Sequence, residues 1–354
     1  MHEWEDTNHV LVGTKCNRLL RLDADVGSVQ SIPLPPAPPR RRAPYDHEWG
    51  HCGIHGLALS PSRDWLAVGG ENPADIVILR RGDWRPVATL VGHLDWVFGV
   101  TWVSDRHVVT AGRDQSVALW SIDDEATYDD EGPEASPWGA VVAKDWARRG
   151  DFRKAFQGKV RDVKYDVSTA IVATLSLEGA VRLHDPAAAL TPVRKIKLPI
   201  ESHRDELACL ALTPGFCAIG RQADVVLVDP RARGSAPLRW SSRPTPRVAV
   251  QGDSLLSFGT AAGRLCFHDL RYGARGAGSA PAPATLCPPS ALARVVDTGA
   301  GWVDKNETYW DHFAHTRVPH ACYAHAWDPC GARLFACGGP LAFGMRGCYL
   351  GLWR

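Results

Sequence analysis

The strongest constraint on this chain is a short sequence unit that recurs along it. Its clearest copy is GHLDWVFGVTWVSDRHVVTAGRDQSVALW, at residues 92–120. The apolar runs at 96–102, 107–111 and 116–120 predict three short strands separated by turns. Such a unit forms a small antiparallel sheet. Its loop, turn and strands would be joined by buried hydrogen bonds among His93, Thr110, Asp114 and Trp120.

Similar units recur at intervals of about 35 to 60 residues. The Gly-His, Asp and Leu-Trp positions of the clearest copy are typical of a blade of a WD40 propeller. Counting a partial first copy, the sequence predicts an all-β fold, a seven-bladed WD40-type β-propeller, as one domain over 1–354. The approximate blades are 1–34, 50–91, 92–122, 158–199, 203–240, 245–270 and 318–354.

The segments between these blades are predicted to be loop insertions, at 35–49, 123–157 and 271–317. The first overlaps PLPPAPPRRRAP (33–44), which fits a solvated loop but also a Pro-rich ligand or a basic tag. The second is acidic and the third is low in complexity. Regular blades resume after each one, so none marks a domain boundary.

The two ends of the sequence predict difficulty in closing the propeller. The last blade ends at Arg354 directly after its third strand, so its fourth strand should come from the N-terminus. The first blade, however, begins almost at Met1, with only residues 2–4 for its inner strand. We therefore expect an incompletely closed propeller and a shortened version of a longer protein.

Composition excludes several classes of protein. Hydrophobic residues make up 45% and charged residues 22%, as in a packed globular protein. With 40 Lys plus Arg against 39 Asp plus Glu, bulk charge does not favour nucleic-acid binding. There is neither an apolar run long enough for a membrane span nor a signal peptide, so we expect a cytoplasmic and nuclear protein without membrane partners.

Neither catalysis nor a metal centre is predicted. The sequence has no nucleophile elbow, P-loop or HExxH motif, so we expect no enzyme and no cofactor. Its 10 cysteines include no CxxC pair, which favours buried thiols in a reducing compartment. The cluster of His312, His315, His320 and His325 allows a metal site, but histidines with structural hydrogen bonds are the favoured alternative.

Beyond the repeats, long segments resemble one family. They include VGTKCNRLLRLD (12–23), HLDWVFGVTWVSD (93–105), TGAGWVDKNETYW (298–310) and CGGPLAFGMRGCYLGLW (337–353). The chain resembles the damage-specific DNA-binding protein 1- and cullin-4-associated factor 12 family over nearly its whole length. The resemblance implies a substrate receptor of cullin-4 RING ubiquitin ligases. Such a receptor would bridge the adaptor, damage-specific DNA-binding protein 1, to substrates ending in two Glu residues.

Two Asp-x-Arg sequences are candidates for the adaptor contact. Asp229 and Arg231 follow one predicted strand, and Asp269 and Arg271 follow another. Asp-x-Arg at a strand end also forms local salt bridges, so both interpretations stay open. The resembled family has an N-terminal extension that docks on the adaptor, and this sequence does not include it. A WD40 interaction scaffold without ligase docking is therefore the alternative function.

A pocket for acidic chain ends would need several converging cations, and Arg suits carboxylates because of its bidentate fork. When the blades are aligned by their inner strands, one equivalent position holds His55, Phe98, Arg161, Ala208, Arg247 and Tyr323. We predict a substrate pocket there, made of Arg113, Lys159, Arg161 and Arg247, with Arg204 as a weaker candidate. These positions match the basic residues of the resembled family. A purely structural role for such arginines is the alternative.

Overall fold

The structure, a computed structural model, describes residues 1–36, 53–122, 146–147, 156–198, 207–213, 215–221, 224–231, 238–241, 248–251, 255–270, 292–299, 301–314, 316–341 and 344–354. The chain divides into two compact units, Met1–Pro199 and Ile200–Arg354. Regular structure in these ranges is almost entirely β-strand. Within the same ranges, no helix is long and apolar enough to cross a membrane.

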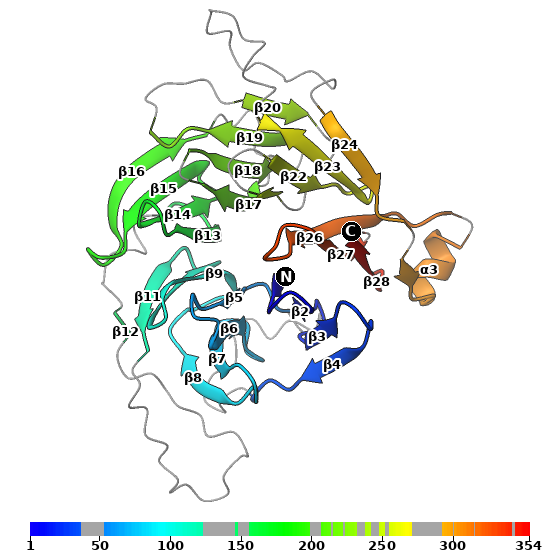
Figure 1. Cartoon of the computed structure of the whole chain (residues 1–354), viewed down its shortest axis with the longest axis horizontal. Coiled ribbons are helices and arrows are strands. Elements are labelled where there is room, and N and C mark those ends of the chain that lie inside the picture. The colour runs from blue at the N-terminus through cyan, green and yellow to red at the C-terminus, as the bar shows by residue number, and fades with distance from the viewer. Residues whose placement is uncertain are drawn as a thin grey trace, which may run out of the picture. The chain divides into compact units, whose positions relative to one another are not determined.

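The first unit contains four antiparallel sheets of four strands each, with the strands of every sheet in chain order (Figure 1). The first two sheets comprise β1 (His2–Trp4), β2 (His9–Gly13), β3 (Leu19–Asp23) and β4 (Val29–Ile32), then β5 (Leu57–Leu59), β6 (Trp65–Gly69), β7 (Ile76–Arg80) and β8 (Pro86–Leu90). The next two comprise β9 (Val97–Ser104), β10 (His107–Gly112), β11 (Val117–Ser121) and β12 (Trp146–Ala147), then β13 (Val160–Asp166), β14 (Ile171–Ser176), β15 (Ala180–Asp185) and β16 (Thr191–Lys197).

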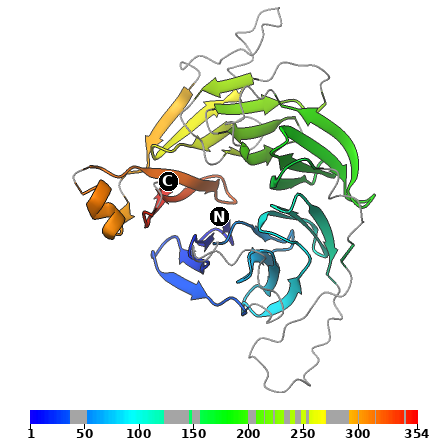
Figure 2. The same ribbon diagram turned by 180° about the vertical axis from the view of Figure 1, so that it is seen from behind.

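The second unit contains three further four-stranded antiparallel sheets, which Figure 2 shows from behind. The first comprises β17 (Leu207–Leu212), β18 (Cys217–Arg221), β19 (Asp224–Val228) and β20 (Leu238–Ser241). The second comprises β21 (Val248–Gln251), β22 (Leu255–Gly259), β23 (Arg264–Asp269) and β24 (Leu292–Asp297). The third has the order β25 (Trp302–Val303), β28 (Gly347–Trp353), β27 (Leu334–Pro340), β26 (His320–Trp327), with helix α3 (Glu307–His312) after β25.

These seven sheets confirm the predicted fold class, a seven-bladed WD40-type β-propeller. The prediction that 271–317 is a loop insertion is wrong in part, because β24, β25 and α3 lie in it. Likewise, β12 lies in the predicted insertion 123–157. Outer strands such as β4 and β16 are largely exposed, so they lack the apolar runs that mark the inner strands.

The fourth strand of the last blade was predicted to come from the N-terminus, and this prediction is wrong. The two-residue strand β25 pairs with Gly347 and Cys348 of β28 and completes that sheet. At the other end, β1 is the inner strand of the first sheet, as its sequence position predicted. That the chain is a shortened version of a longer protein stays a prediction.

The core lies between neighbouring sheets, and each middle strand contributes to two layers of it. In β10, Val108 packs with residues of the second sheet, whereas Val109 packs with residues of the fourth. Successive side chains of a strand point to opposite faces, so a strand that packs between two neighbouring sheets can carry apolar residues at successive positions. This arrangement explains the continuous apolar runs of the repeat.

Adjacent inner strands approach each other very closely. A Cβ atom added to Gly99 in β9 would lie 2.9 Å from the backbone N of Val163 in β13. One added to Gly56, just before β5, would lie 2.6 Å from Cγ2 of Val100 in β9. Contacts below 3.0 Å are too short for a real side chain, so glycine is required at these two positions.

The predicted hydrogen-bond network of the third blade is confirmed. Trp120 Nε1 donates to Thr110 Oγ1 at 2.7 Å, and Thr110 Oγ1 lies 2.6 Å from His93 Nε2. His93 Nδ1 lies 3.1 Å from both carboxylate oxygens of Asp114. Burial opposes ionisation of Asp114, but bonds from His93, Ser116 and the backbone N of Leu94 together lower its pKa well below the usual range.

Replacing Asp114 with alanine should therefore lower the free energy of unfolding by about 2–4 kcal/mol at pH 7, because several buried donors lose their acceptor. Because its folded pKa is depressed, the contribution of Asp114 is present above pH 3.8 and is lost as the pH falls below it. Urea unfolding at pH 7 and pH 3 measures both effects. Asp64→Ala, at an exposed carboxylate, is the control. Equal stability of the two variants at pH 7 would contradict the role of Asp114.

Candidate functional site

The inner strands of four blades share an irregularity at the equivalent position that was found by aligning the blades of this chain with one another. Where each inner strand pairs with its second strand, the register skips one residue: Phe98, Arg161, Ala208 and Tyr323 respectively. A residue skipped in this way forms a β-bulge, which redirects its side chain. The aligned position is thus a structural feature of the blades and not a coincidence of spacing.

The remaining members of the aligned set differ. His55 lies two residues before β5, and Arg247 lies outside the described residues, as does Arg204. Tyr323 is the fourth residue of β26, and its hydroxyl donates to the carbonyl oxygen of Pro340 at 2.6 Å. The convergence of Arg161 with Arg247 therefore stays a prediction.

In the first unit, the aligned residues of three consecutive blades touch one another. The His55 and Phe98 rings lie edge to face with centroids 5.5 Å apart. The guanidinium of Arg161 lies over the Phe98 ring, 4.6 Å from its centroid. The bulges at Phe98 and Arg161 thus place an aromatic ring and a cation from neighbouring sheets in direct contact.

A second guanidinium joins this group from the turn between β10 and β11. Arg113 lies over the Trp96 ring, 5.2 Å from its centroid, and the Trp96 ring stacks on His55 at 6.1 Å. The backbone N of Arg113 also donates to the carbonyl oxygen of Trp96 at 2.7 Å. We call these five residues, Arg113, Trp96, His55, Phe98 and Arg161, the cation–aromatic row.

One carboxylate lies at the Arg113 end of the row. Asp95 Oδ2 is 3.5 Å from Arg113 Nε, and the Arg113 side chain is 28% exposed. This ion pair positions the guanidinium but also reduces the net positive charge that it offers to a ligand. Arg113 therefore has the local structural role that was the alternative for it, because it pairs with Asp95. It also stays accessible to a ligand, because its side chain is partly exposed.

Lys159, the third predicted cation of this unit, precedes Arg161 by two residues at the start of the fourth blade. Its backbone oxygen accepts a hydrogen bond from the N of Leu177 at 2.9 Å, and its side chain is half-buried. Within the described part of the chain, no carboxylate pairs with its ammonium group.

Of the candidate adaptor residues, Asp229 and Arg231 form the local contact that was the alternative for them. Arg231 Nε lies 3.1 Å from Asp229 Oδ1, and the backbone N of Arg231 donates to the same oxygen at 2.8 Å. The Arg231 side chain is nevertheless 72% exposed, so the pair stays accessible to a partner. Asp269 ends β23 half-buried, and Arg271 lies outside the described residues.

Two members of the histidine cluster, His320 and His325, make structural hydrogen bonds. His320 Nε2 donates to the carbonyl oxygen of Trp302 at 3.1 Å, and His325 Nε2 lies 2.9 Å from Ser257 Oγ. His312 packs on Phe313, and His315 lies outside the described residues. These contacts favour the structural interpretation over a metal site.

Among the described residues, one group has ligand spacing suitable for a cation: Glu5, Asp6 and His9. Its charge is already balanced by arginines. Glu5 accepts hydrogen bonds from Arg21 Nε at 2.5 Å and from Arg81 Nε at 3.0 Å, and Arg81 also lies 3.3 Å from Asp6 Oδ2. Two guanidiniums in contact with the carboxylates disfavour a metal ion there.

The prediction that the cysteines are small buried side chains holds for most of those that the structure describes. Five of the eight in the described ranges are buried: Cys209, Cys217, Cys266, Cys322 and Cys337. Burial raises the pKa of Cys217 and Cys322 to about 12. These thiols stay protonated at neutral pH and are poor nucleophiles.

Sequence reasoning identified the cations of the row but missed much of their setting. Phe98 and His55 appeared in the aligned position without an assigned role, and Trp96 and Asp95 were not considered as site residues. The available signal was the HLDWVFGV segment, where an acid and two aromatic residues immediately precede or begin an inner strand.

The fold and the hydrogen-bonded blade turns define a WD40-type propeller, a class that binds partners and is typically non-catalytic. Within that class, the chain belongs to the DDB1- and CUL4-associated factor 12 beta propeller family, whose model matches residues 1–354. It is also similar to an uncharacterized WD repeat-containing protein of Synechocystis sp., at 36% identity over 66 residues. That match covers 18% of this chain and 18% of the Synechocystis protein, so it spans only a small part of that relative's length.

Proposed function

We propose that this protein is a non-catalytic substrate receptor of a cullin-4 RING ubiquitin ligase. It recognises substrates with acidic C-termini ending in Glu-Glu, and the cation–aromatic row forms part of the binding site. Family membership supports the receptor role. The observation that carries the substrate class is the pair of guanidiniums, Arg113 and Arg161, fixed on aromatic rings at the two ends of one row.

The chemistry of such a chain end matches the row. Two Glu side chains and a terminal carboxylate place three anionic groups within a few ångströms. A single cation cannot neutralise all three, so a site for them needs several cations. Arginines held on aromatic rings lose little freedom on binding and offer bidentate donors to carboxylates. Lys159 adds a charge without a carboxylate partner among the described residues.

In this proposal the partners are the adaptor, damage-specific DNA-binding protein 1, and substrate proteins with acidic C-termini. The protein needs no cofactor, binds neither nucleic acid nor membrane, and acts in the cytoplasm and nucleus. A WD40 interaction scaffold that binds acidic tails without ligase docking is the second candidate. The intra-turn pairing of Asp229 with Arg231 is compatible with either function.

Arg161→Glu should weaken binding of a fluorescein-labelled peptide ending in Glu-Glu by at least about tenfold, because a charge-assisted bond is replaced by repulsion. Fluorescence polarisation measures the affinity, and a peptide ending in Gln-Gln provides the background. Lys197→Glu, an exposed charge reversal on β16 of the same blade, should leave the affinity unchanged. Equal affinity of Arg161→Glu and the parent protein would remove Arg161 from the site.

Asp95→Asn should tighten binding of the same peptide by about two- to fivefold, because it removes a carboxylate that competes for Arg113. The amide still accepts the bond that the backbone N of Trp96 donates to Asp95 Oδ1 at 2.8 Å, so the turn keeps its shape. Asp105→Asn, at the far end of β9, makes the same change in net charge and should have no effect. Tighter binding in both variants would show that only bulk charge matters.

Arg231→Ala should reduce co-purification of the adaptor if this exposed arginine makes the contact, and Arg294→Ala, exposed on β24, should not. The measurement is a pull-down from cells with quantification of the adaptor. If Arg231→Ala recovered as much adaptor as the parent protein, the Asp229–Arg231 pair would have only a structural role in its turn. Absence of the adaptor from the parent protein, with Glu-Glu binding retained, would favour the scaffold.

A further inference from the structure

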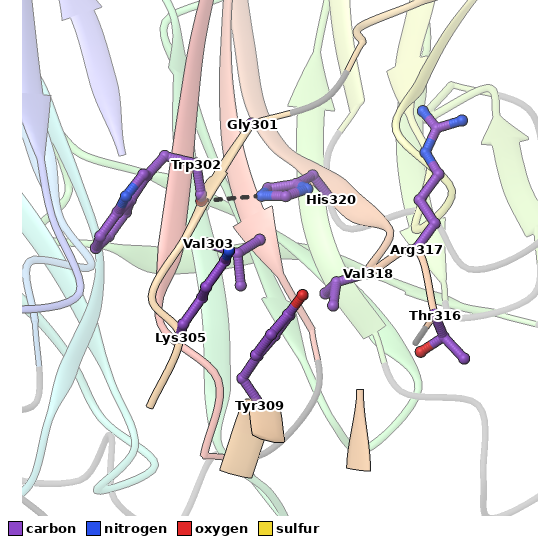
Figure 3. A pocket seen from close by; sticks show the side chains of 9 residues that line it. All are labelled: Gly301, Trp302, Val303, Lys305, Tyr309, Thr316, Arg317, Val318 and His320. Carbon is purple, nitrogen blue, oxygen red and sulfur yellow. Dashed lines mark hydrogen bonds between the residues drawn. The ribbon is translucent and has the colours of Figure 1, made fainter. Parts of the chain in front are cut away.

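A second candidate binding site lies in the last blade, outside the cation–aromatic row. It is a pocket of about 600 Å³ bounded by β25, α3 and the start of β26 (Figure 3). Aromatic, cationic and hydroxyl side chains line it: Trp302, Lys305, Tyr309, Thr316, Arg317 and His320. None of its lining residues is an acid.

The inner wall of the pocket is held rigidly. His320 is buried, and its Nε2 donates to the carbonyl oxygen of Trp302, the bond drawn in Figure 3. Trp302 also pairs with Cys348 of β28. Next to it, a Cβ atom on Gly301 would lie only 2.6 Å from the carbonyl oxygen of Cys348, so this segment packs directly on the sheet. A ligand would therefore meet a preformed wall.

The opposite side of the pocket is a short helix that presents aromatic residues to solvent. Asn306 caps α3 by accepting a hydrogen bond from the N of Tyr309 at 3.0 Å, and its amide donates to the carbonyl oxygen of Gly344 at 2.9 Å. No residue of α3 is buried. Trp310 in the helix is 60% exposed and Trp302 in β25 is 63% exposed.

Two cations line the pocket on opposite sides, Lys305 from the segment before α3 and Arg317 from the segment before β26 (Figure 3). Lys305 Nζ lies 5.9 Å from the centre of the Trp310 ring. Neither cation pairs with a carboxylate in the part of the chain that the structure describes. Elsewhere in the protein, half-buried arginines such as Arg182 and Arg333 are paired with acids.

We propose that this pocket binds an acidic peptide segment of a partner protein. Its carboxylates would lie between Lys305 and Arg317, and an apolar neighbour would pack on Trp302. Charge complementarity selects the occupant, because two cations without acidic partners flank a pocket with no carboxylate in its lining. Exposed tryptophans beside cations are also typical of the residues that dominate binding at interfaces. The site needs no free C-terminus, which distinguishes it from the cation–aromatic row.

The probe is a fluorescein-labelled Gly-Glu-Leu-Glu-Leu-Gly peptide with an amidated C-terminus, compared with its Gln-for-Glu twin. Polarisation titrations with the whole chain should show binding of the acidic peptide and at least about tenfold weaker binding of the twin. Lys305→Gln and Arg317→Gln should each weaken acidic-peptide binding by about tenfold. Arg294→Gln, which removes an exposed charge from β24, should have no effect.

Each alternative outcome overturns the proposal. These outcomes are no binding of the acidic peptide, equal binding of its twin, or affinity unchanged in both Lys305→Gln and Arg317→Gln. Both side chains are exposed, so folding should be unaffected, and circular dichroism melting checks this. Arg161→Glu is the arm that separates the two sites. If Arg161→Glu lost binding of the acidic peptide and Lys305→Gln bound it as tightly as the parent protein, the peptide would be assigned to the cation–aromatic row.

Discussion

The close approach of neighbouring inner strands is the constraint on which the rest of the first unit depends. Gly99 has no room for a side chain because the backbone at Asp162 and Val163 lies against it. This contact fixes how β9 and β13 are placed relative to each other. Phe98 precedes Gly99, and Arg161 precedes Asp162, so the same contact brings the ring and the guanidinium together. Backbone packing thus determines the spacing of the candidate site.

The network that stabilises the third blade also supports the candidate site. Asp114 is fixed by His93 and by backbone donors, and Arg113 is the residue immediately before it in the same turn. A turn held by buried hydrogen bonds presents its neighbouring side chain in one orientation, which reduces the entropy lost on binding. The WD40 framework therefore has a functional consequence beyond stability.

The two candidate sites differ in how their cations are balanced. In the cation–aromatic row, Asp95 forms an ion pair with Arg113, so selectivity for an acidic ligand would depend on geometry as well as charge. In the pocket of the last blade, Lys305 and Arg317 lack carboxylate partners among the described residues. Charge would therefore contribute more than geometry to selectivity for an acidic ligand. Both combine cations with aromatic rings, a composition suited to peptides that carry acidic groups.

The sequence by itself determined the repeat, the number of blades and the hydrogen-bonded residues of the third blade, because those depend on local patterns of apolar and turn residues. It also placed Arg161 and Phe98 in one equivalent position. Only the tertiary structure decided that the position is a bulge, that Trp96 and His55 join Arg113 to Phe98, and that β25 completes the last blade. Those features depend on contacts between residues far apart in the chain, and short outer strands such as β25 carry too little periodicity to be recognised.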